Sequence, residues 1–155
     1  MKALLWLAAV VALSGCQPPL AAAVRTAEAE VGPSPVLLAA VAVHADDARR
    51  TAFASADPKP LEPYFGGRAL LRLRLQVARL AGHGVHRIEV LDSRRVVHQG
   101  GAPGLPEVVL EIRARQQDGS AWSTVLRQWR AQLGRQGGSW LVMEEGDLPP
   151  VAWWR

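Results

Sequence analysis

The feature that most limits how this chain can fold is its single cysteine, Cys16. One cysteine cannot form an intramolecular disulfide, so the folded part must rest on its hydrophobic core and its hydrogen bonds. The position of Cys16 adds a second limit. It follows a start with Lys2 and an apolar run over residues 3–13. A charged start before a short apolar run is typical of a secretory signal, and the run is too short to span a bilayer.

The four residues that end this segment, Leu13-Ser14-Gly15-Cys16, resemble the lipobox of bacterial lipoproteins. The resemblance implies cleavage between Gly15 and Cys16, with residues 1–15 removed as a signal peptide. It also implies lipid on the Cys16 thiol, with acyl chains such as palmitate. Two or three such chains would anchor the protein stably to a membrane. The alternative is an ordinary secretory signal in which the cysteine falls at this position by chance.

The lipobox resemblance also implies a location in the cell envelope. Gln17, rather than Asp, follows the cysteine. In a Gram-negative cell this implies the outer membrane; otherwise it implies the extracytoplasmic face of the cell membrane. Residues 16–33 contain several prolines and alanines and are expected to form a tether from the lipid to the folded part.

The net charge of the chain is small and does not by itself indicate a particular class of partner. There are 18 lysines and arginines against 14 acidic residues, and loss of Lys2 with the signal would leave a small positive excess. Arginine supplies almost all of the positive charge. We expect the membrane to be contacted through the N-terminal lipid, and export argues against a nucleic-acid partner. Binding of an anionic envelope polymer by an arginine-rich face is a further hypothesis, and it predicts binding that weakens with salt.

Local signals predict helices in the first half of the folded part. Ser34-Pro35 is a good helix start, and a helix is expected from about Pro35 to Ser55, ended by the prolines at 58 and 60. Residues 61–65 predict a short turn or helical fragment. Residues 68–81 fit both an alternating strand and a helix. The helical period explains the whole segment and places Leu73 and Val77 opposite a row of arginines, so we predict a helix that ends at the glycines 82 and 84.

The second half of the chain predicts antiparallel strands. Residues 85–92 alternate in polarity, and residues 95–98 either continue that strand past a bulge or form a second strand. Residues 100–106 are expected to form a loop. Further strands are predicted over 107–116, 121–133 and 139–144, joined by the Asp-Gly signal at 117–119 and by the glycines in 135–138.

Helices followed by hairpins predict an α+β fold, in which two or three N-terminal helices pack on one face of a curved antiparallel sheet of about four strands. Such a sheet closed by helices would form a cone with an apolar mouth. The folded domain is expected over residues 34–148, with residues 149–155 as a C-terminal tail that contains Trp153 and Trp154.

The order of elements resembles the nuclear-transport-factor-2-like superfamily and, more narrowly, the IMS domain first named in chloroplast and cyanobacterial division proteins. The likeness covers about residues 36–144. It rests on the sequences Leu61-Glu62-Pro63-Tyr64-Phe65, Arg87-Ile88-Glu89-Val90-Leu91-Asp92 and Gly137-Gly138-Ser139-Trp140-Leu141-Val142. The aromatic-rich middle strand often found in IMS domains is not evident. The resemblance implies the cone-shaped fold and leaves the activity open.

No catalytic constellation stands out in the sequence. Asp46-Asp47, Glu89 or Asp92 could be general bases inside a cone, but a surface position is expected for them. The histidines at 83, 86 and 98 could in principle meet at a metal, but solvated loops are the simpler interpretation. We therefore predict no cofactor and no metal.

The sequence leaves two function classes open. The first is a non-enzymatic binding module for an envelope protein partner or a small apolar ligand. The second is an enzyme of the same superfamily, of the isomerase, dehydratase or cyclase type, with one buried acid or base. The residues expected to line a cavity are Leu73, Val77, Leu110, Ile112, Trp129 and Trp140.

Overall fold

The computed structural model describes residues 32–118 and 120–149. The predicted signal peptide, nearly all of the predicted tether and residues 150–155 with the two terminal tryptophans lie outside the described residues. The described residues from Pro33 on form one compact unit. Its elements follow the order α2 (Pro35–Ser55), η1 (Lys59–Leu61), α3 (Gly67–Gly82), β1 (Ile88–Ala102), β2 (Leu105–Asp118), β3 (Ala121–Gln136) and β4 (Ser139–Leu148).

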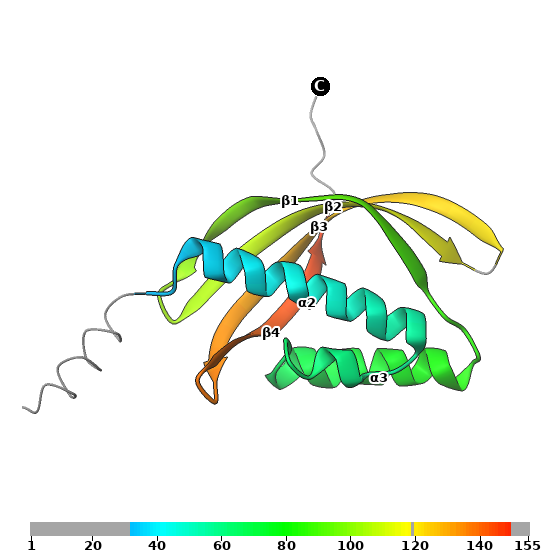
Figure 1. Cartoon of the computed structure of the whole chain (residues 1–155), viewed down its shortest axis with the longest axis horizontal. Coiled ribbons are helices and arrows are strands. Elements are labelled where there is room, and N and C mark those ends of the chain that lie inside the picture. Colours follow the sequence, from blue (N-terminus) through cyan, green and yellow to red (C-terminus); the bar gives the residue numbers. More distant parts are fainter. Residues whose placement is uncertain (1–31, 119, 150–155) are drawn as a thin grey trace, which may run out of the picture. The chain divides into compact units, whose positions relative to one another are not determined.

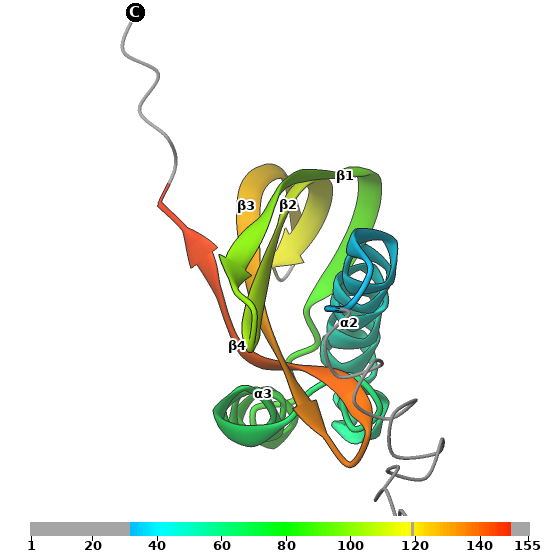
Figure 2. The same ribbon diagram turned by 90° about the vertical axis from the view of Figure 1, so that its left-hand side faces the viewer.

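The α+β prediction is confirmed. The four strands form one antiparallel sheet in the order β1-β2-β3-β4, and the two helices pack against it (Figures 1 and 2). The sheet is open, with β1 and β4 at its edges. The narrower expectation of a closed cone stays a prediction.

Both long helices begin and end where the sequence predicts. The Ser34 side chain caps α2 by accepting a hydrogen bond from the backbone N–H of Leu37 at 3.2 Å, and Pro35 occupies the first turn. Ala56, in the left-handed region with φ 53°, ends the helix. In α3 the helical period outweighs the strand alternation because Ala69, Leu73 and Val77 become one buried stripe.

The predicted loop over 100–106 is wrong. β1 runs to Ala102 and β2 begins at Leu105, so only Pro103 and Gly104 connect them. Gly101 makes this possible with φ +92°, which glycine adopts without strain. β3 and β4 are also longer than predicted. The alternative of one strand continuing past a bulge is confirmed, since β1 shifts register between Leu91 and Ser93 and again between Val96 and His98.

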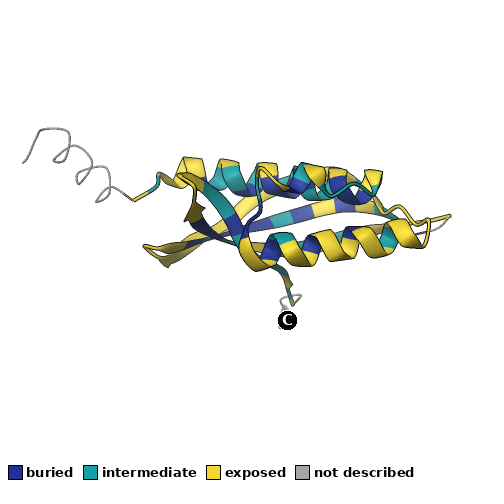
Figure 3. Cartoon of the chain, turned by 90° about the horizontal axis from the view of Figure 1, so that it is seen from below, coloured by how far each residue is buried: buried dark blue, intermediate teal, exposed yellow. Residues whose placement is uncertain are grey.

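One hydrophobic core joins the helices to the inner face of the sheet. Alternate residues of β2 point into it, namely Val108, Leu110, Ile112 and Ala114, and β3 contributes Trp129, Ala131 and Leu133. The outward sides of both helices stay exposed (Figure 3). The other face of the sheet, which we call the outer face, carries the side chains that alternate with these core residues.

Candidate binding site

The inner face of the sheet contains a charged cluster beside the core. We call it the ion-pair cluster and define it as three carboxylates and four arginines: Asp46, Asp47, Glu89, Arg49, Arg50, Arg94 and Arg127. Asp46 at its centre is fully buried, with an exposed fraction of 0%. The expected surface position of Asp46 is therefore wrong, and so is that of Glu89, whose side chain is 7% exposed.

The partners of Asp46 come from a helix and two strands. Its Oδ2 lies 2.9 Å from Arg94 Nη1 on β1 and 3.1 Å from Arg50 Nη1, and its Oδ1 accepts a hydrogen bond from Arg49 Nη2 at 3.3 Å. Arg127 on β3 reaches the same Oδ1 at 3.7 Å. Because buried charges are tolerated only when they are paired, the burial of Asp46 follows from these four guanidinium groups.

The sheet register brings the two strand arginines to this position. Arg94 and Arg127 are both cross-strand partners of Ile112, from β1 and β3 respectively. A regular strand would turn residue 94 to the outer face. The bulge at Asp92 inserts one residue, and a slip of one residue reverses the faces, so Arg94 points inward toward α2.

Asp47 and Arg94 favour each other's charged forms. Burial alone would raise the pKa of Asp47, but the hydrogen bonds and charges of Arg94 and Arg50 outweigh it and hold the pKa of Asp47 below its usual value. Burial alone would lower the pKa of Arg94, but Asp47 and Asp46 outweigh it and raise that pKa. Both groups therefore stay ionised at neutral pH.

The remaining members tie the cluster to the core. Arg127 donates to Glu89 Oε1 at 2.8 Å and to the exposed Asp147 at 3.2 Å. Beside it, the indole N–H of Trp129 donates to Glu145 Oε2 at 2.7 Å. The indole N–H of this fully buried tryptophan is thereby satisfied.

This arrangement is suited to holding structure rather than to proton transfer. A general base must take up a proton near neutral pH, whereas Arg94 and Arg50 hold the pKa of Asp47 below its usual value. Each of the four carboxylates considered as a base pairs with at least one arginine, including the exposed Asp92 with Arg115 at 3.4 Å.

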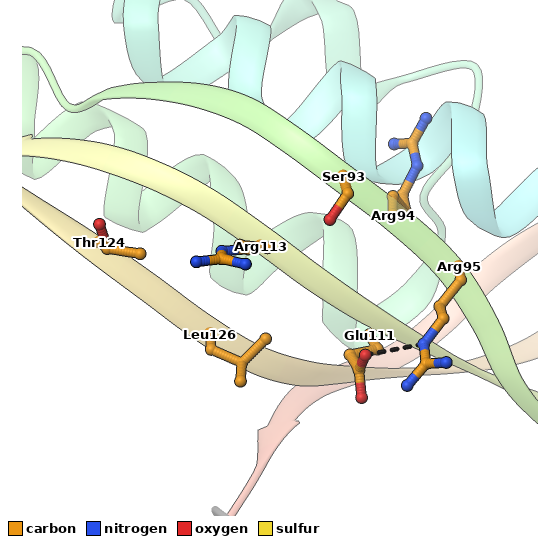
Figure 4. A pocket seen from close by; sticks show the side chains of 7 residues that line it. All are labelled: Ser93, Arg94, Arg95, Glu111, Arg113, Thr124 and Leu126. Atoms are coloured by element: carbon orange, nitrogen blue, oxygen red, sulfur yellow. Dashed lines mark hydrogen bonds and ion pairs between the residues drawn. The ribbon is translucent and has the colours of Figure 1, made fainter.

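The outer face of the sheet offers a groove instead. A hollow of about 440 Å³ lies over β1, β2 and β3, and we call it the outer groove (Figure 4). Its lining residues are Ser93, Arg94, Arg95, Glu111, Arg113, Thr124 and Leu126. Arg94 borders it only at one wall, because its side chain is directed to α2 (Figure 4).

One end of the outer groove is fixed by an ion pair. Arg95 Nε donates to Glu111 Oε1 at 2.7 Å across the paired strands. This hydrogen bond raises the pKa of Arg95 and lowers the pKa of Glu111. The charges at this end therefore largely satisfy each other.

The other end of the outer groove contains an arginine without a partner in the described residues, beside an exposed leucine. Arg113 has no hydrogen bond or ion pair within the described part of the chain, and its cross-strand partners are Ser93 and Leu126. Leu126 is 68% exposed, and Trp122, on the same face of β3, is 51% exposed. The exposed Leu126 lies beside the guanidinium of Arg113, which has no partner in the described residues, and the two form a surface that can hold both an apolar group and a carboxylate.

The six residues predicted to line a cavity lie together on the inner side. Five of them are fully buried in the core, and Trp140 packs against it half-buried. The hollow over the outer face of the sheet and the two hollows beside α3 are lined by other residues. A ligand cavity among the six stays a prediction.

Of the three histidines considered as metal ligands, two lie in the connection between α3 and β1 and the third lies on β1. His83 follows α3, His86 Nδ1 contacts the carbonyl oxygen of Ala54 at 3.0 Å, and His98 pairs with Val109 on the sheet. Over residues 32–118 and 120–149, no group of three His, Cys, Asp or Glu side chains could hold a metal ion.

Sequence reasoning missed the arginine partners of the cluster and the role of Arg113. The alternation of residues 121–133 did place Trp122, Thr124 and Leu126 on one face, opposite Trp129 and Leu133. The signal for an exposed apolar row was therefore present, since that face alternates with the core side.

No protein-family model matches the chain, and no curated protein sequence matches it. Its fold is similar to that of the crystal structure of the intermembrane space region of the chloroplast protein ARC6, with a TM-score of 0.66 and 16% identity over 75% of this chain and 98% of that chain. A de novo designed β-sheet protein matches with a TM-score of 0.47 and 13% identity over 72% of this chain and 89% of its own. Within the described residues, no helix has both the length and the apolar character needed to cross a bilayer. The predicted resemblance to the IMS domain is thus supported at the level of the fold.

Proposed function

We propose that this chain is a lipoprotein of the cell envelope, anchored through lipid on Cys16, whose folded domain is a non-enzymatic module that binds a protein partner. The observation that carries the binding role is the outer groove, in which the free Arg113 lies beside the exposed Leu126. The arginine-paired carboxylates of the ion-pair cluster argue against the enzyme hypothesis.

The groove defines the chemistry of the partner. An aliphatic or aromatic side chain of the partner would cover Leu126, and a further apolar residue of the same segment would cover Trp122, four residues away along β3. A carboxylate on the same segment would pair with Arg113, whose planar guanidinium can donate two parallel hydrogen bonds. The partner segment is therefore expected to combine an apolar anchor with an acidic residue.

Site-specific photocrosslinking in the native host tests the binding role. A photoreactive residue at position 126 of the full acylated chain is expected to give one discrete protein adduct, whereas the same residue at the exposed Ser139 gives none. R113E should remove the adduct at 126, because a carboxylate on the partner would then meet a like charge. An adduct that persists in R113E, or no adduct at 126, contradicts the binding proposal.

The anchoring has its own test. Mass spectrometry of the N-terminal peptide of the protein from its native membrane is expected to show a lipid-modified Cys16 as the first residue, and labelled palmitate should enter the wild type but not C16S. A free Cys16 thiol behind an intact leader contradicts the anchoring. The lipobox residues and Gln17 support the envelope location in this proposal.

A further inference from the structure

The outward side of α3 carries a second surface that the core does not explain. Six residues spaced three or four apart form a continuous stripe along this helix: Arg68, Leu71, Arg72, Leu75, Gln76 and Arg79. They line a shallow groove of about 410 Å³. Leu71 is 62% exposed and Leu75 is 54% exposed, on the side of the helix opposite the buried Leu73 and Val77. We call this surface the α3 stripe.

The charge of α3 is entirely positive. The helix contains four arginines and no acidic residue. Arg72 pairs with Glu145, and Arg74, beside the stripe, pairs with Glu62. Arg68 and Arg79 have no hydrogen bond or ion pair within the described part of the chain. The two exposed leucines therefore lie between two guanidinium groups that are free to bind an anion.

We propose that the α3 stripe docks onto the surface of an anionic phospholipid bilayer. A helix with apolar residues between cationic ones lies in the plane of such a surface, with the apolar side chains at the boundary of headgroups and acyl chains. Arg68 and Arg79 would contact lipid phosphates, since guanidinium pairs well with phosphate. The stripe offers long, flexible side chains around two leucines, which suits a fluid surface more than the shaped pockets of protein hot spots.

This proposal rests on the proposed membrane anchoring for one step. Two leucines and two free arginines give only weak binding from solution. An acylated Cys16 would hold the domain beside the bilayer, where the effective concentration is high enough for a weak contact to be populated.

Fluorescence quenching in vesicles tests the docking. The acylated protein, purified from its host and inserted in vesicles, carries one fluorophore on Q76C in the stripe or on T124C in the outer groove. The acylated Cys16 leaves the introduced thiol as the only one. Brominated lipids are expected to quench the probe at 76 but not at 124 in phosphatidylglycerol vesicles. In phosphatidylcholine vesicles both probes should stay bright.

Charge variants measure how much the free arginines contribute to the docking constant. Each arginine near an anionic surface contributes enough that R68Q/R79Q should lower the docking constant by about thirtyfold. The control R87Q/R135Q removes the same net charge from exposed positions outside α3 and should change it by less than about twofold. High salt should mimic the first pair of substitutions.

Three results would overturn the docking. They are equal quenching at 76 and 124, quenching at 76 that does not depend on anionic lipid, and a probe at 76 that stays bright in every vesicle, as expected if a protein covers the stripe. Anchoring is scored separately, by whether the chain stays with the vesicles through a wash in about 1 M salt, which screens charges beyond about 3 Å. A chain that washes off but still shows the contrast between the probes contradicts the anchoring and retains the docking.

Discussion

The substitution Asp46→Asn tests whether the ion-pair cluster holds the sheet onto α2. Asparagine keeps the shape of the side chain but removes the charge that faces four guanidinium groups at 2.9 to 3.7 Å. At an effective dielectric constant of about 20, one pair at 2.9 Å has a Coulomb energy of about 6 kcal/mol, and most of this is offset by the cost of desolvating both groups.

The net loss on breaking a buried ion pair is therefore about 3–5 kcal/mol. The cluster has few spare hydrogen-bond acceptors that could compensate for the lost carboxylate. Two of its buried guanidinium nitrogens, Arg49 Nε and Arg127 Nε, already lack a hydrogen-bond acceptor within the described residues, and Arg50 Nη1 lies 3.1 Å from Asp46 Oδ2 without forming a hydrogen bond. An Asn amide nitrogen would add another donor among them. A loss of this size is a large share of the 5–15 kcal/mol by which a domain of this kind is stable.

Urea unfolding followed by tryptophan fluorescence measures this loss. With a denaturant slope of about 2 kcal/mol/M, the midpoint of D46N should fall by about 2 M. The matched control is D47N on the neighbouring residue, whose side chain is 48% exposed and which should lose less than about half as much. Equal losses in the two variants, or a loss below about 1 kcal/mol in D46N, would refute the reasoning.

Three further outcomes are expected. Because the pKa of Asp47 is lowered in the folded chain, the unfolded chain takes up protons first, so stability should fall as the pH drops below the ordinary aspartate pKa of 3.8, and D47N should flatten this fall in urea titrations. Gly101→Ala should lower the free energy of unfolding by more than about 1 kcal/mol, because φ is +92° and a Cβ would lie 2.6 Å from the Leu105 carbonyl oxygen. Gly104→Ala, where a Cβ would enter open space, should change the free energy of unfolding by less than about 0.5 kcal/mol. Ser34→Ala should cost about 1 kcal/mol in the same assay and fray the first turn of α2, seen as faster amide exchange there.

The sequence predicts the helices well because their signals are local. Each end of α2 is set by residues within a few positions of it, Ser34 at the start and Pro58 just beyond the end. The hairpin at 100–106 was mispredicted because Gly and Pro there read as loop, whereas the chain uses Gly101 to keep the ladder paired up to a two-residue turn.

The ion-pair cluster escaped prediction for a different reason. Its partners are 48 residues apart for Asp46 and Arg94, so no local pattern links them. The alternation of polarity also misleads at Arg94, because the bulge at Asp92 reverses the faces of β1 beyond it. The sequence shows which residue types are present, but a one-residue register shift decides which of them are buried.

The outer groove and the α3 stripe differ from the rest of the fold because their apolar side chains do not point to the core. The apolar side chains of a helix or strand are explained when they point to the core, as Leu73 and Trp129 do. Leu71 and Leu126 contribute nothing to that core and expose apolar area to water, a cost that a binding partner would remove. Each is next to an arginine that has no ion pair in the described residues, so both surfaces favour an occupant that is apolar in part and anionic in part. The outer groove is a hollow over three strands of the sheet and suits a shaped protein segment, whereas the α3 stripe is a shallow surface along one exposed side of a helix and suits a bilayer. If R113E alone abolished docking on vesicles, or R68Q/R79Q alone abolished the protein adduct, this division of roles would be wrong.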